Sequence, residues 1–277
     1  MKKTVFILLL AGFATQLKAQ QQASFKPVYS PKTTYTDTRD MTTAMNMNAG
    51  GQQINMNMIM NTLAITETGA ADQTKSVPVK ITNKSTDIKM TMNGQDMPSG
   101  QIPPVSMVIY GKYLPDSKLH IDSISGQKLT DSLKAAMVQM AENVQNLVKF
   151  PDHPVKVGET FTMDAPFSMP MMAMGGGNNM TVKMTYKLIS ITNDVAAFDI
   201  SENMDIDLSK PEPAKNTGMT MVIKGLGTGS MSYNIKKQYM VSMVNNVDVD
   251  FDMSIGGQAV KGKGTVASKD NVVVAAN

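Results

Sequence analysis

Methionine is the residue type in this chain that offers the most specific chemistry. The 277 residues include 27 methionines and no cysteine. Thioether sulfur is a soft donor suited to Cu(I), so converging methionines can form a copper site. The methionine side chain is also unbranched and polarizable, and surfaces that adapt to varied apolar partners use it heavily. The composition therefore supports two hypotheses, a pocket for a hydrophobic ligand and a copper site.

The segment 52–61, QQINMNMIMN, places methionine at every second position from Met56 to Met60. In a strand such side chains share one face, and they would spread over roughly 13 Å, too far for convergence on one ion. We interpret the segment as the lining of a core or of a ligand pocket. The residues predicted to line this pocket are Met56, Met58, Met60, Met90, Met92, Met137 and Met140. The alternative is an ordinary core in which methionine replaces leucine, valine or phenylalanine and no ligand binds.

The copper hypothesis rests on a different segment, 169–174, which reads MPMMAM and precedes three glycines. A flexible loop of this composition can fold several sulfurs around one Cu(I) ion. The candidate ligands are Met169, Met171, Met172 and Met174, with Met41, Met45 and Met47 as a second set. Apart from this copper alternative, no cofactor is predicted.

The other reactive residue types give no sign of an enzyme. A nucleophilic serine would need a strained elbow such as G-x-S-x-G together with a histidine base, and that elbow is absent. The only histidines, His120 and His153, are expected to be exposed polar residues, because no partners for catalysis accompany them. Asp248, Asp250 and Asp252 alternate with apolar residues and lack a calcium-binding loop, so we assign them to the outer face of a strand. We predict a non-enzymatic protein.

Most of the chain alternates apolar and polar residues with a period of two, which is typical of strands with one buried face. The alternation runs through two meanders, 25–125 and 155–275. Between them, apolar residues recur at spacings of three and four over 129–149, which predicts an amphipathic helix that Pro151 ends. We therefore predict a mainly β (α+β) fold, with one long helix packed on a curved antiparallel sheet or half-open barrel. Residues 20–277 are expected to form a single domain.

Three local features interrupt the alternation. The apolar phase changes after Asn61, from Met60 to Leu63, which indicates a bulge or a bend. Asn93-Gly94 is a turn sequence. The alternating glycines of 225–229 lack the lysine of a phosphate-binding loop, and in a β-rich chain they indicate sharp bends.

The first 19 residues predict export. Lys2 and Lys3 precede an apolar run of about ten residues, and Ala19 follows, as in a signal peptide cleaved before Gln20. The run is shorter than the roughly 20 residues of a membrane-spanning helix, and no later stretch approaches that length. Without cysteine the amino terminus cannot carry the lipid of a lipoprotein. We expect a soluble protein of the periplasm or the medium that is not lipid-anchored.

Charge and composition argue against nucleic acid as a partner. The chain has 26 basic and 23 acidic residues, and removal of Lys2, Lys3 and Lys18 with the signal peptide leaves 26 − 3 = 23 basic residues, hence a neutral protein. Aromatic residues make up 5% of the chain, so the basic stripe with interleaved aromatics of a nucleic-acid binder is missing. The partners that remain are a hydrophobic small molecule, such as an acyl chain, or a protein of the envelope.

The order of these elements resembles a family of exported bacterial proteins classed as a domain of unknown function. The similarity lies in the signal peptide, the two meanders separated by a helix, and the segment 150–161, FPDHPVKVGETF. The family brings no activity, cofactor or catalytic residue. The expected architecture is also similar to the half-barrels of lipoprotein carriers and of mycobacterial lipid-binding lipoproteins.

Overall fold

The computed structural model describes residues 21–26, 28–97, 107–126, 138, 142, 149–167, 180–207, 219–255 and 258–276. The described part of the chain contains fourteen strands. They are β1 (Gln22–Ala23), β2 (Thr33–Ala49), β3 (Gln52–Thr68), β4 (Val77–Met92), β5 (Gln95–Asp96), β6 (Met107–Tyr113), β7 (Leu119–Gly126), β8 (Val155–Lys156), β9 (Thr160–Phe167), β10 (Met180–Thr192), β11 (Val195–Asp207), β12 (Met219–Asn234), β13 (Tyr239–Ile255) and β14 (Gln258–Ala276).

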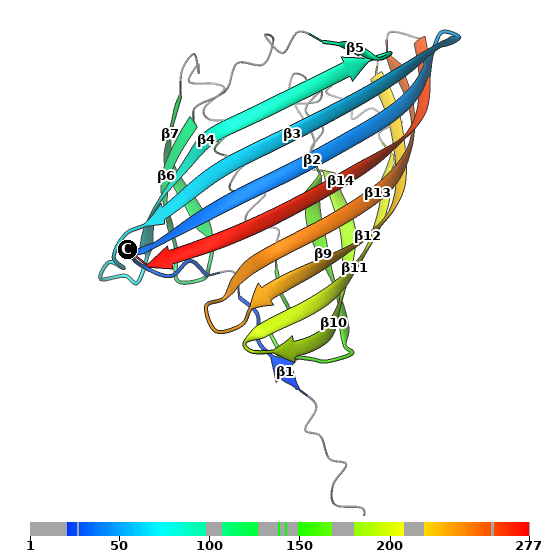
Figure 1. Cartoon of the computed structure of the whole chain (residues 1–277). Coiled ribbons are helices and arrows are strands. Elements are labelled where there is room, and N and C mark those ends of the chain that lie inside the picture. The colour runs from blue at the N-terminus through cyan, green and yellow to red at the C-terminus, as the bar shows by residue number, and fades with distance from the viewer. Residues whose placement is uncertain are drawn as a thin grey trace, which may run out of the picture.

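Twelve of these strands form one antiparallel sheet in the order β7-β6-β4-β3-β2-β14-β13-β12-β11-β10-β9, with β5 paired to β4 (Figure 1). Each meander of the sequence forms one half of the sheet. The two halves join where β14 pairs with β2, from Val260 opposite Ala49 to Ala276 opposite Thr33. The short strands β1 and β8 pair with each other outside this sheet.

Tight turns fix the register of neighbouring strands. Gly50-Gly51 joins β2 to β3, Asn93-Gly94 joins β4 to β5, and Asn193-Asp194 joins β10 to β11, and all six residues have positive φ. Two positive φ values in a two-residue loop match the right-handed twist of a hairpin, and glycine, asparagine and aspartate tolerate them. The predicted turn at Asn93-Gly94 is therefore confirmed. The β3–β4 register shifts between Leu63 and Ala64, but the extra residue, Lys84, lies on β4, and β3 runs opposite β2 without a shift. The bulge expected after Asn61 is therefore in the neighbouring strand.

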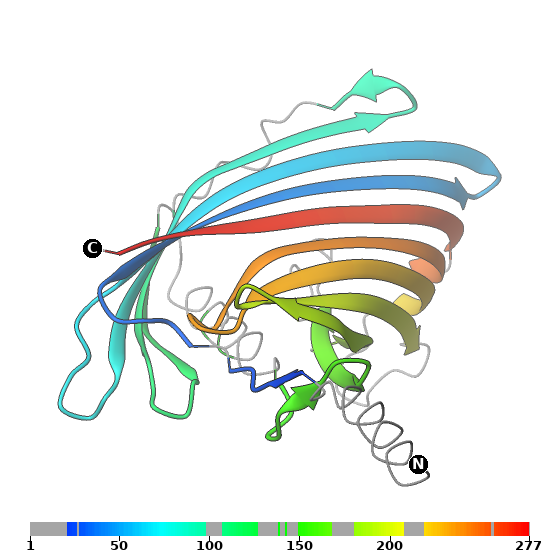
Figure 2. The ribbon, with the colours of Figure 1, turned by 60° about the horizontal axis from the view of Figure 1, so that its bottom comes forward.

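The sheet arches, and its flanking strands curve toward the same side (Figure 2). We call this concave side the inner face and the opposite side the outer face. At one flank, Phe25 next to β1 packs on Phe198 and Tyr233, with ring centroids 5.1 and 5.5 Å away. At the other flank, side chains of β4, β6 and β7 form a separate buried cluster that includes Val79, Ile109 and Ile121. A third buried cluster, around Ile223 and Phe251, lies on β10 to β13.

The predicted α+β fold is wrong. The described residues are nearly all in strands, and of the expected helix 129–149 only Val138 and Glu142 have described helical conformation. Val138 packs on the cluster of β4, β6 and β7, and the Glu142 carboxylate accepts a hydrogen bond of 2.7 Å from the Ile121 N–H. The prediction assumed that an apolar sheet face needs a long helix to cover it. In the described part, the curled flanks of the sheet and the β1–β8 segment cover part of the inner face instead.

Glycines on the inner face allow close approach rather than sharp bends. Gly225, Gly227 and Gly229 lie within β12, which continues through them in unbroken register with β11 and β13. A Cβ atom on Gly227 would lie 2.9 Å from the Val247 side chain and 3.0 Å from Cβ of Glu202. The missing side chains therefore let neighbouring strands fill the inner face, and no register shift accompanies these positions.

Gly262 in β14 provides a test of this packing. A Cβ atom there would lie 2.6 Å from the carbonyl oxygen of Asn46 and even closer to the ring of Phe251. Because backbone cannot move aside cheaply, we expect Gly262→Ala to lower the free energy of unfolding by about 1–3 kcal/mol, as overpacking does in other cores. Urea unfolding followed by circular dichroism measures the change.

Gly69→Ala is the matched control. A Cβ atom at Gly69 meets Pro78 at 3.4 Å, which is ordinary contact, so no loss of stability is expected. Equal destabilisation by the two substitutions would show that the close contact at Gly262 does not limit the packing.

Candidate hydrophobic ligand-binding face

The inner face of β2, β3 and β4 carries an apolar surface rich in methionine, with the buried Thr43 among its side chains. Register places Met56 between Met45 and Met92, Met58 opposite Met90, and Met60 between Met41 and Ile88. We call the set the methionine surface. Its members are Met41, Met45, Met47, Ile54, Met56, Met58, Met60, Ile88, Met90 and Met92. Alternation places these side chains on one face because successive residues of a strand point to opposite sides.

The methionine surface is half-buried, unlike the core beside it. Every one of its members has intermediate exposure, whereas Met204, Met221 and Ile223 on β11 and β12 are each at most 3% exposed. The outward residues between its members, Asn55 and Asn57, are exposed. The strands therefore have an apolar inner face and a polar outer face, as the alternation predicted, but the apolar face is only partly covered.

The predicted site residues fall into two groups. Met56, Met58, Met60, Met90 and Met92 lie together on the methionine surface, so the structure brings these five side chains to one place. Met137 and Met140, the other two predicted pocket residues, lie outside the described residues. The copper candidates Met169, Met171, Met172 and Met174 also lie outside them. Met41, Met45 and Met47, proposed as a second copper set, belong to the same surface.

A polar band borders the methionine surface on the inner face. Arg39 follows Met41 on the inward side of β2, and its Nε–H donates a short hydrogen bond to the carboxylate of Asp270 on β14. The Asp270 side chain is 2% exposed and that of Arg39 is 51% exposed. Two residues further along β2, Asp37 has one carboxylate oxygen that is buried without a hydrogen-bond partner among the described residues. Sequence reasoning missed this band, because residues 39 and 270 give no local signal of pairing.

The band continues toward the other half of the sheet through Glu202. This residue is 8% exposed, and its carboxylate accepts a hydrogen bond of 2.6 Å from the Asn245 amide. Burial, followed by the Glu202 carboxylate, raises the pKa of the Tyr186 hydroxyl to about 12. Buried polar groups of this kind need partners, and their position fixes where the apolar surface ends.

Burial also raises the pKa of Asp37 above the ordinary value of an aspartate. Desolvation is the largest cause, and it outweighs the attraction of the Arg39 guanidinium, while the Asp270 carboxylate adds to the rise. Folding therefore disfavours the charged form of the Asp37 carboxyl.

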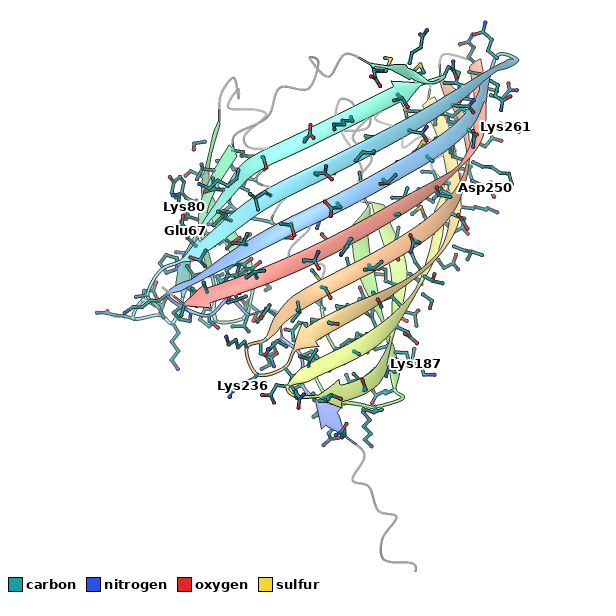
Figure 3. The ribbon with its side chains drawn as sticks, viewed as in Figure 1. Glu67, Lys80, Lys187, Lys236, Asp250 and Lys261 are labelled. Atoms are coloured by element: carbon teal, nitrogen blue, oxygen red, sulfur yellow. The ribbon has the colours of Figure 1, made fainter. Side chains whose placement is uncertain are left out.

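The acidic row of β13 lies on the outer face, as predicted. Asp248, Asp250 and Asp252 are exposed, and two of them pair with β14, because Lys263 Nζ lies 3.1 Å from Asp250 and Lys261 Nζ lies 2.8 Å from Asp252. Figure 3 shows Asp250 and Lys261 projecting from the outside of the sheet. Lysines of β14 therefore neutralise two of the three carboxylates across strands. Among the described residues, no group of three or more histidine or acidic residues could hold a metal ion.

Both histidines are exposed polar residues, as expected. The side chain of His153 is 64% exposed, and its Nε2 lies 2.8 Å from Glu159. The side chain of His120 is 53% exposed and lies near Asp122 and Glu142. A shallow depression between side chains of Asn46, Lys224, Leu226 and Thr265 lies on the outer face and shares no residue with the methionine surface.

The fold and this face define a protein with an open, arched antiparallel sheet and a half-exposed apolar inner surface. Residues 118–239 match the model of a family of unknown function, DUF6263. The match confirms the expected similarity to a family without an assigned function, over less than half of the chain. No curated protein matches the chain in sequence.

Lipovitellin and two autotransporter domains are among the solved structures similar to this chain. A lipovitellin structure that describes lipid–protein interactions has a TM-score of 0.46 and 8% identity, over 90% of this chain and 26% of that one. This chain thus spans about a quarter of lipovitellin. The translocator domain of the autotransporter NalP from Neisseria meningitidis has a TM-score of 0.20 and 7% identity, over 88% of this chain and 90% of that one.

The beta domain of the Bordetella autotransporter BrkA is similar at a TM-score of 0.21 and 8% identity, over 85% of this chain and 98% of that one.

Among the residues that the structure describes, no helix has the length and apolar character needed to cross a membrane.

The raised pKa of Asp37 predicts how stability depends on pH. Because the folded state holds this proton more tightly than the unfolded chain, stability falls as pH rises from the unfolded pKa of about 3.9 through the higher folded value. We expect Asp37→Asn to raise the free energy of unfolding at pH 7 and to leave it unchanged at pH 3, where both states are protonated. Urea titrations at the two pH values measure this. An equal gain at both would assign the effect to packing rather than to charge.

The Arg39–Asp270 pair predicts a second stability effect. Arg39→Ala leaves the buried Asp270 carboxylate without its partner, and loss of one member of a buried pair typically costs about 3–5 kcal/mol. We expect a loss near the lower end of that range, because Arg39 is half exposed. Adding Asp270→Asn to Arg39→Ala removes the stranded charge and should recover part of the loss in urea unfolding. If the double variant is as unstable as the sum of the two single ones, the pair is not coupled.

Proposed function

We propose that this protein is an exported, non-enzymatic binder of a hydrophobic molecule, such as an acyl chain, and that the ligand lies on the methionine surface. The observation that carries the proposal is the intermediate exposure of every member of that surface, beside core residues on the same face that are almost fully buried. An apolar surface left partly open is a common mark of a binding site.

The energetics of such a site favour a long apolar ligand. Each methylene group that leaves water for an apolar contact contributes about 0.8 kcal/mol. Cross-strand rows such as Met45, Met56 and Met92 run across the strands, so a chain laid along a row would contact three neighbouring side chains at once. Methionine side chains can adjust their shape to ligands of different length or branching.

The polar band suits the other end of an amphiphilic ligand. Arg39 lies two residues from Met41 on the inward side of β2, and half of its side chain is exposed. The Nε–H of Arg39 donates to Asp270, and a guanidinium carries further N–H donors that a polar head group could accept from. The exported location rests on residues 1–19 of the sequence.

A charged substitution on the methionine surface tests the proposal. Met58 is half-buried in the middle of β3, and Asn57 next to it points to the outer face. We expect Met58→Asp to weaken the binding of a fluorescent fatty acid at least tenfold, because ligand contact would desolvate the new carboxylate. Titration of the mature protein, followed by fluorescence, measures this affinity.

Asn57→Asp is the matched control, since it adds the same charge on the other face of the same strand. It is expected to change the affinity by less than twofold. Met58→Gln removes the apolar side chain without adding a charge, so it separates the effect of the charge from the loss of apolar surface. Thermal unfolding of each variant shows whether that variant is folded. If both aspartate variants bind the fatty acid like the parent protein, or if the parent does not bind it, the proposed function is wrong.

A further inference from the structure

The register of β2, β3 and β4 brings methionines from three strands to one level of the inner face. Met56 lies directly opposite Met45 on one side and Met92 on the other. One step along the strands, Met58 lies opposite Met90. We call these five residues the thioether cluster; they are Met45, Met56, Met58, Met90 and Met92.

The spacing within the thioether cluster permits convergence on one ion, although spacing along a single strand does not. Directly opposed residues of antiparallel strands have Cβ atoms about 4.5–5.5 Å apart, whereas residues two apart along a strand are separated by about 6.6 Å or more. The sulfur of methionine lies two bonds beyond Cβ. Thioethers of Met45 and Met92 can therefore lean toward Met56 from both sides and place three sulfurs around one point.

The chemistry of the cluster fits a soft monovalent ion. Its donors are uncharged thioethers, which bind Cu(I) well and divalent hard cations poorly. Thr43, opposite Met58, is 3% exposed, and the charged groups of the inner face begin at Arg39, six residues from Met45 along β2. The half-buried setting leaves access for the ion, since all five side chains have intermediate exposure.

The choice of residue type supports a role for sulfur itself. Isoleucine and valine have higher strand propensity than methionine and would fill an apolar sheet face. At the level of Met56 all three strands carry methionine, while the neighbouring positions Ile54 and Ile88 show that isoleucine is accommodated on the same face.

We propose that the thioether cluster is a Cu(I) site, in which Met45, Met56 and Met92 supply the ligands and Met58 and Met90 lie beside them. This site does not include the segment 169–174. It lies on the same surface as the proposed fatty-acid site, but the two ligands require different chemistry. Cu(I) needs the sulfur atoms, and an acyl chain needs only apolar area.

Substitution of methionine by leucine separates the two requirements, because leucine keeps most of the apolar volume and removes the sulfur. The mature protein is titrated anaerobically with Cu(I) against a chromogenic Cu(I) chelator, and Ag(I), which has no redox chemistry here, is counted by native mass spectrometry. We expect one ion per chain, at least tenfold weaker binding in Met56→Leu, and loss of binding in the triple variant Met45→Leu/Met56→Leu/Met92→Leu.

Two control variants define the outcomes. Met204→Leu changes a buried methionine of β11, at 2% exposure, and should leave Cu(I) affinity within twofold. A variant with leucine at Met169, Met171, Met172 and Met174 should also retain binding. Retention of Cu(I) by the triple variant, or its loss in the loop variant alone, would overturn the proposal.

Fatty-acid binding measured on the same proteins keeps the two proposals apart. A parent protein that binds Cu(I) but no fatty acid would support the metal site and reject the proposed function. The reverse result would reject the metal site alone.

Discussion

The antiparallel pairing of β2 with β14 holds the first long strand of the chain against the last. It runs from Ala49 opposite Val260 to Thr33 opposite Ala276. In the strand order of the sheet, this pairing links the first meander to the second. Without this ladder β2 would be an edge strand, and the clusters of β10 to β13 would belong to a separate sheet. The Arg39–Asp270 pair bridges these same two strands, so a buried ionic contact reinforces the junction on which the inner face depends.

The inner face combines a closed core with a partly open surface, and the glycines of β12 and β14 help to set the division. Where Gly227 and Gly262 remove side chains, Val247 and Phe251 from β13 fill the space and the interior is tightly packed. Across β2 to β4 the long methionines remain half-exposed. A protein that leaves such a surface open accepts a risk of aggregation unless something binds there. The outer face lowers that risk with cross-strand charge pairs, such as Lys263 with Asp250 and Lys80 with Glu67 (Figure 3).

Edges of an open sheet carry a similar risk, because unpaired backbone groups invite another strand. The edge strand β9 contains Pro166, which lacks an N–H donor, and the edge strand β7 carries His120 and Asp122. Such residues discourage pairing with a second sheet. Both proposals for the methionine surface concern a face of the sheet and not its edges. Fatty-acid binding depends on the apolar area of that face, whereas Cu(I) binding depends on its sulfur atoms.

The sequence by itself determined the strands, several turns and the side on which each residue lies. Alternation with a period of two is a local property, so Met56, Met58 and Met60 could be placed on one face and Asp250 on the other from neighbouring residues alone. The same local reasoning gave the wrong fold class, because a stripe of apolar residues does not say whether a long helix or the sheet itself covers the inner face.

Only the tertiary structure decided which strands are neighbours. The ladder between β2 and β14 and the contact between Arg39 and Asp270, 231 residues apart, depend on long-range pairing that no local pattern encodes. For the same reason, the sequence showed a row of methionines along one strand, too widely spaced for an ion. The register of the sheet placed Met45 and Met92 on either side of Met56. Cross-strand neighbours are closer to each other than alternate residues of one strand, so these three sulfurs can approach one point.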